Sequence, residues 1–142
     1  MNQRLKDLYK SVILKHNNEP FQFEKNENAT HQLDAYNQLC GDRFNLFFEI
    51  ENGVIQNFTF HGFGCAISKA STSVLVKNLE GKTIEEALSL CEIFQKEVQP
   101  DLVAEGNASE EFEAFSAAKD FPGRLKCATL SWDEIIKFLK KK

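Results

Sequence analysis

Three of the four cysteines in this sequence, Cys40, Cys65 and Cys127, lie next to glycine or just after a chain-breaking segment. Asp42 follows Cys40 by two positions, so its carboxylate can lie beside that thiolate around the small Gly41. Three thiolates and one carboxylate would complete a tetrahedral zinc site or bind iron. The sequence has no Cys-x-x-Cys pair and matches no zinc finger, so from spacing alone a chance placement of loop cysteines stays open.

The fourth cysteine lies in a different setting. Cys91 belongs to the apolar stripe of a predicted helix, whose other members are Ile84, Ala87, Leu88, Phe94 and Val98. A free cysteine in such a position packs as a small hydrophobic residue. We therefore predict that Cys91 is a buried, unreactive thiol outside the site.

The histidines are weaker ligand candidates than the cysteines. His16 ends the first predicted helix and His31 lies in a polar stretch, so both are expected to be exposed. His61 precedes Cys65 by four residues and is expected near the site as a hydrogen-bond donor to a ligand. None of the three is predicted to bind a metal.

The sequence patterns also predict the elements that carry the cysteines. Apolar spacing predicts a helix over residues 2–16, which is followed by a polar loop. Alternating residues on both sides of Asn52-Gly53 predict a β-hairpin over 44–60, with a further strand within 30–36. The predicted fold is α+β: one compact domain, residues 1–142, with a small antiparallel sheet packed against helices.

Two of the cysteines are predicted at helix starts. Gly62 and Gly64 permit a tight backbone just before a helix over 66–79, which puts Cys65 at its N-terminus. Phe121-Pro122-Gly123 breaks the chain shortly before Cys127, which we expect at the start of the terminal helix. Helix N-termini at both positions would favour thiolate over thiol. Between these helices we predict one that starts with a Thr83/Glu86 capping box, and then a short helix within 101–120.

Composition and charge exclude several classes of function. The formal net charge of −4 leaves no basic surface for nucleic acid, and no apolar run approaches the roughly twenty residues of a membrane span. The N-terminal residues lack the apolar core of a signal peptide, so we expect a cytoplasmic protein. Cysteines in a reducing compartment are typically thiols, catalytic groups or metal ligands.

Four segments resemble the SufU branch of the IscU/NifU-N family of iron–sulfur cluster assembly proteins. They are Leu8-Tyr9-Lys10-Ser11-Val12-Ile13-Leu14, Leu39-Cys40-Gly41-Asp42-Arg43, Gly62-Phe63-Gly64-Cys65-Ala66-Ile67-Ser68-Lys69-Ala70-Ser71 and Arg124-Leu125-Lys126-Cys127-Ala128-Thr129-Leu130-Ser131-Trp132. Lys126 occupies the position where IscU-type members have histidine, and the 101–120 stretch resembles an extra segment of SufU-like chains. The family's Asn-Pro-x-Cys pattern is replaced by Asn37-Gln38-Leu39-Cys40, which leaves the shape of that loop open.

The resemblance implies a function as well as a fold. It implies a zinc ion held by Cys40, Asp42, Cys65 and Cys127, with Cys40 accepting persulfide sulfur from a SufS-type cysteine desulfurase. Downstream Suf-type assembly components would then take the sulfur. Arg124 matches a family arginine that assists docking or ligand exchange, although an ordinary surface charge explains it equally well.

Two other functions use the same residues. A scaffold would assemble and deliver a [2Fe–2S] cluster, because iron and zinc sites share thiolate ligands. A structural zinc site would only stabilise the fold, but a domain with 42% hydrophobic residues hardly needs such support. The replacement of histidine by Lys126 favours zinc, and therefore zinc-dependent sulfur transfer, over the scaffold.

Overall fold

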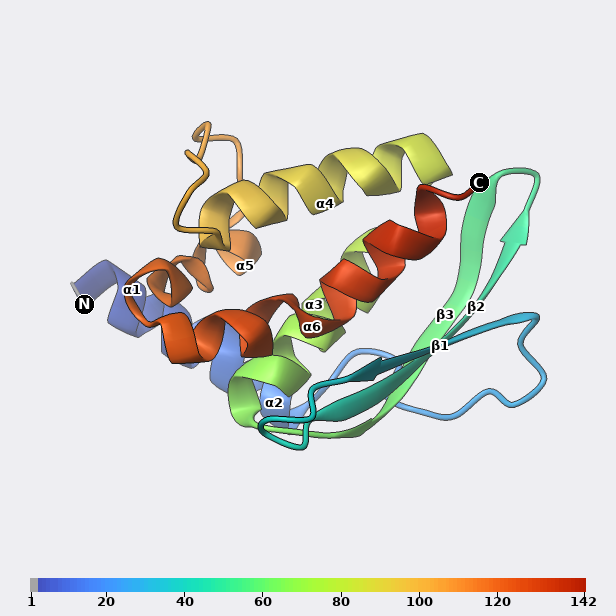
Figure 1. Ribbon diagram of the computed structural model, residues 1–142, viewed down its shortest axis with the longest axis horizontal. Coiled ribbons are helices and arrows are strands. Elements are labelled where there is room, and N and C mark those ends of the chain that lie inside the picture. The colour runs from blue at the N-terminus through green and yellow to red at the C-terminus, as the bar shows by residue number, and fades with distance from the viewer. Residues whose placement is uncertain (1–2) are drawn as a thin grey trace.

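The computed structural model describes residues 3–142, in which helices enclose one side of a small sheet (Figure 1). The elements, in chain order, are α1 (Gln3–Leu8), η1 (Tyr9–Leu14), α2 (Lys15–Asn18), β1 (His31–Tyr36), β2 (Arg43–Glu51), β3 (Val54–Phe63), α3 (Ala66–Leu79), α4 (Ile84–Val98), α5 (Glu110–Glu113), η2 (Ser116–Asp120) and α6 (Pro122–Leu139). Helices α3 and α6 pack against each other and on the sheet, and α4 packs on α6. The α+β prediction is confirmed. Over residues 3–142, every helix is too short or too polar to cross a bilayer.

The sheet confirms the predicted hairpin and the third strand. Strands β1, β2 and β3 are antiparallel neighbours in that order, with Leu46 of β2 paired to Leu33 on one side and to Phe60 on the other. Asn52 and Gly53 both have positive φ, 54° and 76°, as a tight hairpin turn requires. Strand β3 runs three residues beyond the predicted end at Phe60, because the chain through Phe63 still pairs with β2.

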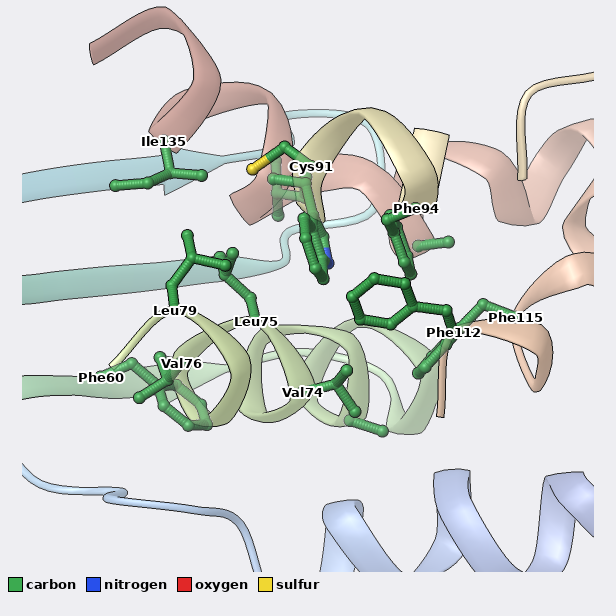
Figure 2. Close-up of a cluster of buried hydrophobic side chains, with 14 of the residues drawn as sticks. Phe60, Val74, Leu75, Val76, Leu79, Cys91, Phe94, Phe112, Phe115 and Ile135 are labelled. Atoms are coloured by element: carbon green, nitrogen blue, oxygen red, sulfur yellow. The ribbon is translucent and has the colours of Figure 1, made fainter. Parts of the chain in front are cut away.

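The helical core explains the position of Cys91. Its thiol is 1% exposed among the apolar side chains of α3, α4 and α6 (Figure 2), so the predicted burial is confirmed. The ring of Phe94 stacks on Trp132 with centroids 4.0 Å apart, and Phe112 meets both rings edge-on. Helix α4 begins with the predicted capping box, since Thr83 Oγ1 accepts from Glu86 N and Glu86 Oε1 accepts from Thr83 N.

The N-terminal helix corrects one prediction and refines another. The predicted helix over 2–16 is a continuous helical run to Asn18, with a π-helical stretch in its middle, and Asn2 lies outside the described residues. His16 was expected to be exposed but is buried. Its Nδ1 lies 2.7 Å from Ser73 Oγ and its Nε2 lies 2.9 Å from Glu111 Oε2, so two hydrogen bonds offset the loss of water.

The same network fixes the segment between α4 and α6. The hydrogen bond with His16, assisted by one from Lys77, lowers the pKa of Glu111 to about 2. Glu111 belongs to α5, the short helix that was predicted within 101–120 and is confirmed there. The pairing therefore ties this segment to the N-terminal helix and to α3.

The other two histidines pack on aromatic rings. His31 is half-buried rather than exposed, because it stacks on Phe48 with ring centroids 5.3 Å apart. His61 stacks on Phe23 at 4.7 Å. His61 does not line the cavity around the cysteines, among the residues described, so its expected role beside a ligand gains no support.

Candidate metal centre

The turn between β1 and β2 carries Cys40 and Asp42. Asn37 N donates to Asp42 O (2.9 Å) and Gly41 N donates to Asn37 O (2.8 Å), which closes the turn. Asn37 Oδ1 also accepts from Leu39 N, so an asparagine side chain orders a loop that lacks the family's proline. Gly41 has a φ of +77°, a conformation that glycine adopts without strain.

Cys40 and Asp42 differ sharply in exposure although they are two residues apart. Cys40 is exposed, whereas Asp42 is only 3% exposed. The Cys40 thiol donates to Asp42 Oδ2 at 3.2 Å. The turn thus presents a thiol at the surface and holds a carboxylate beneath it.

The carboxylate of Asp42 also contacts the junction between β3 and α3, where the β1–β2 turn lies beside the start of α3 (Figure 1). Cys65 N donates to Asp42 Oδ1 at 3.0 Å. Cys65 is the N-cap of α3, as the predicted helix start requires, and its Sγ accepts from Ser68 N at 3.4 Å. The Asp42 carboxylate therefore ties the β1–β2 turn to the start of α3.

Gly64 makes this approach of Asp42 possible. A Cβ placed on Gly64 would lie 2.9 Å from Asp42 Oδ1 and 2.8 Å from Phe44 Cε2. Phe44 is fully buried, so its ring has little freedom to move. The Asp42 carboxylate therefore occupies the space that a side chain at position 64 would need.

Cys127 lies inside a helix rather than at its start, which corrects the prediction. Helix α6 begins at Pro122, and Cys127 is in its second turn. The segment Phe121-Pro122-Gly123 was interpreted as a break, but proline suits the first position of a helix, because its missing N–H has no intrahelical partner there. The expected help from a helix N-terminus is absent at Cys127.

The electrostatics of the Cys127 thiol follow from its neighbours. Burial, followed by the hydrogen bond with Cys65 and by the negative charges that Cys65, Asp42 and Cys40 carry when ionised, raises its pKa to about 12. In the metal-free protein this thiol is protonated at neutral pH. A cation among the same side chains would reverse the effect of these negative charges.

A polar seam between α3 and α6 holds Cys127 near Cys65. Ser71 Oγ accepts from Trp132 Nε1 at 3.0 Å and donates to Ala128 O at 2.5 Å. Thr72 Oγ1 lies 2.8 Å from Ser131 Oγ. These buried contacts fix the position of one cysteine-bearing helix relative to the other.

The four predicted metal ligands meet around one cavity of about 610 Å³. The ligand atoms of Cys40, Asp42 and Cys127 lie within 4.8 Å of one another. Cys65 is outside that mutual set, but its backbone N donates to Asp42 and its side chain is near enough to raise the pKa of Cys127. Soft sulfur donors with a single carboxylate suit Zn²⁺ or iron, and the space at Gly64 fits the carboxylate. The donor set therefore fits a metal ion.

Arg124 and Lys126, two charged residues of the fourth resembling segment (124–132), lie at the surface of α6. Arg124 is exposed and lines the cavity that contains Cys40. Lys126 is also exposed, with Nζ 3.9 Å from Asp133 Oδ2, a distance and exposure at which an ion pair contributes little stability. Only Arg124 of this pair lines the cavity.

Comparisons with known proteins agree with this geometry. The family described as the NifU-like N terminal domain matches residues 8–128. The zinc-dependent sulfurtransferase SufU of Bacillus subtilis is 34% identical over 99% of this chain and 95% of its own length. The iron–sulfur cluster assembly scaffold protein IscU of Thermotoga maritima is 33% identical over 96% and 95%. The crystal structure of FiSufU from Fervidobacterium islandicum superposes with a TM-score of 0.81 at 30% identity, covering 91% of this chain and 94% of that one.

Proposed function

The chain belongs to the NifU-like N-terminal domain family, and we propose that it is a zinc-dependent sulfurtransferase of iron–sulfur cluster assembly. It acts as a single domain over residues 1–142, and it accepts sulfur from a SufS-type cysteine desulfurase. The observation that carries the proposal is the convergence of an exposed Cys40 with the buried Asp42 and Cys127. A site with an exposed thiol suits sulfur exchange better than purely structural support.

The proposed metal ligands are Cys40, Asp42, Cys65 and Cys127. When bound, Zn²⁺ would supply positive charge that keeps these thiols deprotonated. Asp42 orients the Cys40 thiol through its Oδ2 and the start of α3 through its Oδ1. Gly41 gives the backbone freedom for Cys40 to turn towards a donor.

The sulfur transfer itself is an exchange between sulfur atoms. The Cys40 thiolate attacks the outer sulfur of the persulfide on the desulfurase cysteine. A new S–S bond forms at Cys40 while the S–S bond of the donor breaks, and the donor cysteine leaves as a thiolate. The exchange needs no external oxidant or reductant.

Arg124 has a proposed role in this exchange. Its guanidinium borders the cavity next to Cys40 and carries a permanent positive charge. It can stabilise the thiolate of the departing donor cysteine or the newly formed persulfide anion. Downstream Suf-type assembly components are the proposed recipients of the sulfur.

A scaffold function is the second candidate. The 33% identity to the Thermotoga maritima IscU scaffold protein over nearly the full length of both chains supports it. The same thiolates would then hold iron and sulfide as cargo. Zinc-dependent transfer is the first candidate, since the SufU relative matches with slightly higher identity and coverage.

The proposal is tested by metal content and desulfurase stimulation in the wild type and in Asp42→Ala. Stoichiometric zinc in the wild type is expected, and Asp42→Ala should lose both the zinc and the stimulation. Asp101→Ala, which changes an exposed acid outside the cavity, is the matched control and should retain both. Iron with sulfide in the purified wild type would favour the scaffold, and zinc without stimulation would favour a structural site.

A further inference from the structure

A second cavity, of about 480 Å³, adjoins the candidate metal centre and shares Cys65 and Arg124 with it. Its walls come from η1, from the beginning of α3, from residues 114–118 and from the start of α6. We call this cavity the side groove. Its main lining residues are Ile13, Ile67, Phe115, Ala117, Phe121 and Arg124.

The side groove is apolar except at one end. Among its lining residues Arg124 alone is charged, and within residues 3–142 its guanidinium forms no ion pair. Phe121 is 55% exposed beside it. An occupant that matches this surface has an apolar group for the walls and a carboxylate for the guanidinium.

Exposed apolar surface continues from the side groove past the metal centre. Phe63, 67% exposed, lines the cavity of Cys40, and Leu39, 97% exposed, precedes Cys40 in the chain. A small amphiphile would fill the side groove and leave these two side chains in water. A polypeptide partner would cover all three surfaces, as the apolar anchors of protein interfaces are usually covered.

We propose that the side groove receives a peptide segment of the sulfur donor in which an acidic residue lies next to an apolar side chain. The apolar side chain would lie against Ile67 and Phe115, and the carboxylate would pair with Arg124. Because Cys65 borders both cavities, a segment anchored there holds the donor's persulfide beside Cys40. This inference rests on the proposed function and adds to it a means of docking.

A graded series at Ala117 tests the groove. Ala117 is half-buried in its wall, and Ala117→Val, Ala117→Leu and Ala117→Trp fill the groove progressively. We expect Ala117→Trp to raise the concentration that gives half-maximal stimulation of the desulfurase about tenfold, or about 1.4 kcal/mol. Stimulation at saturation, zinc content, thermal unfolding and the reaction of Cys40 with a small disulfide should stay as in the wild type.

Ala104→Trp is the matched control, since Ala104 is also half-buried but lies outside the side groove. Equal half-maximal concentrations for Ala104→Trp and Ala117→Trp would overturn the proposal. A change in the chain's own oligomeric state with Ala117→Trp alone would also overturn it, because the groove would then bind a second copy.

A double-mutant cycle tests the acidic residue. Arg124→Gln should weaken desulfurase binding, and Ala117→Trp/Arg124→Gln should be no weaker than Ala117→Trp, because both changes release the same segment. Additive effects would show that Arg124 does not bind the segment in the groove. Calorimetric binding of the desulfurase to each variant separates docking from catalysis: a wild type that binds but accepts no sulfur would defeat the proposed function alone.

Discussion

Cys91 and Cys127 are both buried thiols whose pKa is raised to about 12, yet the causes of the two shifts differ. At Cys91 burial alone opposes the thiolate. At Cys127 burial acts first, and the hydrogen bond with Cys65 and the charges that Cys65, Asp42 and Cys40 carry when ionised add to it. Cys91 is surrounded by apolar side chains, whereas Cys127 is surrounded by other possible donors.

Burial alone therefore does not distinguish a core cysteine from a metal ligand. The neighbours of Cys91 would disfavour both a thiolate and a cation. The neighbours of Cys127 disfavour an isolated thiolate because they are electron-rich, and for the same reason they favour a cation between them. The identity of the surrounding groups decides what each thiol can do.

The largest effect expected from this difference is on sulfur acceptance. Cys40→Ala should reduce persulfide formation on this chain at least about 100-fold, because it removes the attacking thiolate. Cys91→Ala should leave sulfur acceptance unchanged and cost about 1 kcal/mol of unfolding free energy through the small cavity that it creates. Mass spectrometry after incubation with the desulfurase and cysteine detects the added sulfur. Persulfide on Cys40→Ala would exclude Cys40 as the sulfur acceptor. Loss of persulfide in Cys91→Ala would contradict the distinction between the core cysteine and the cysteines of the site.

The sequence predicted most of the fold because its signals are local. The Asn52-Gly53 turn and the Thr83/Glu86 capping box depend on residues within a few positions of one another. His16 was predicted to be exposed because its partners, Ser73 and Glu111, lie far away in the sequence and are brought to it only by the packed helices.

The candidate site, too, could be predicted only where its features depend on residues close together in the sequence. Its ligand types and motifs are readable from the sequence, but the start of α6 was placed too late, because proline at a first helical position resembles a helix break. The close approach of Asp42 to Gly64 and the side groove depend on tertiary packing. The glycine next to Cys65 was interpreted as a source of backbone freedom, while in the structure it leaves space for a carboxylate.

The second-largest expected effect is a loss of stability at alkaline pH that comes from Cys91. The pKa of Cys91 is about 12 in the folded protein, whereas a thiol in the unfolded chain ionises near its ordinary value of 9. The stability that this difference provides is fully present below pH 9 and is lost as the pH rises towards 12. At about pH 10.5 the loss attributable to Cys91 should be about 2 kcal/mol, from 1.36 kcal/mol per pH unit.

Urea unfolding at neutral and alkaline pH measures this loss. Cys91→Ala is the control, because it removes the titrating thiol and leaves Cys127 and every lysine in place. The difference between wild type and Cys91→Ala therefore isolates the contribution of one side chain. An identical decline in both proteins would mean that Cys91 ionises in the fold as it does in water, and the contrast between the two thiols would fail.

The smallest effect expected is on metal affinity and comes from a single methyl group. Gly64→Ala would place a Cβ 2.9 Å from Asp42 Oδ1 and 2.8 Å from Phe44 Cε2, so the carboxylate must move. Asp42 is a proposed ligand, and even the displacement of a group that only orients a ligand typically lowers metal affinity 10- to 100-fold, so we expect a loss of about tenfold for zinc. Competition with a chromophoric chelator measures the affinity.

Gly123→Ala supplies the matched control for this change. Gly123 lines the same cavity, but a Cβ there meets no atom within 4 Å, and alanine in α6 is a better helix former than glycine. Zinc affinity should therefore stay unchanged in Gly123→Ala while it falls in Gly64→Ala. Equal affinities in the two variants would show that the position of Asp42 against Gly64 does not contribute to metal binding. A loss confined to Gly64→Ala would show that zinc binding depends on the position of the Asp42 carboxylate. That carboxylate is one of the groups near Cys127 that Cys91 lacks.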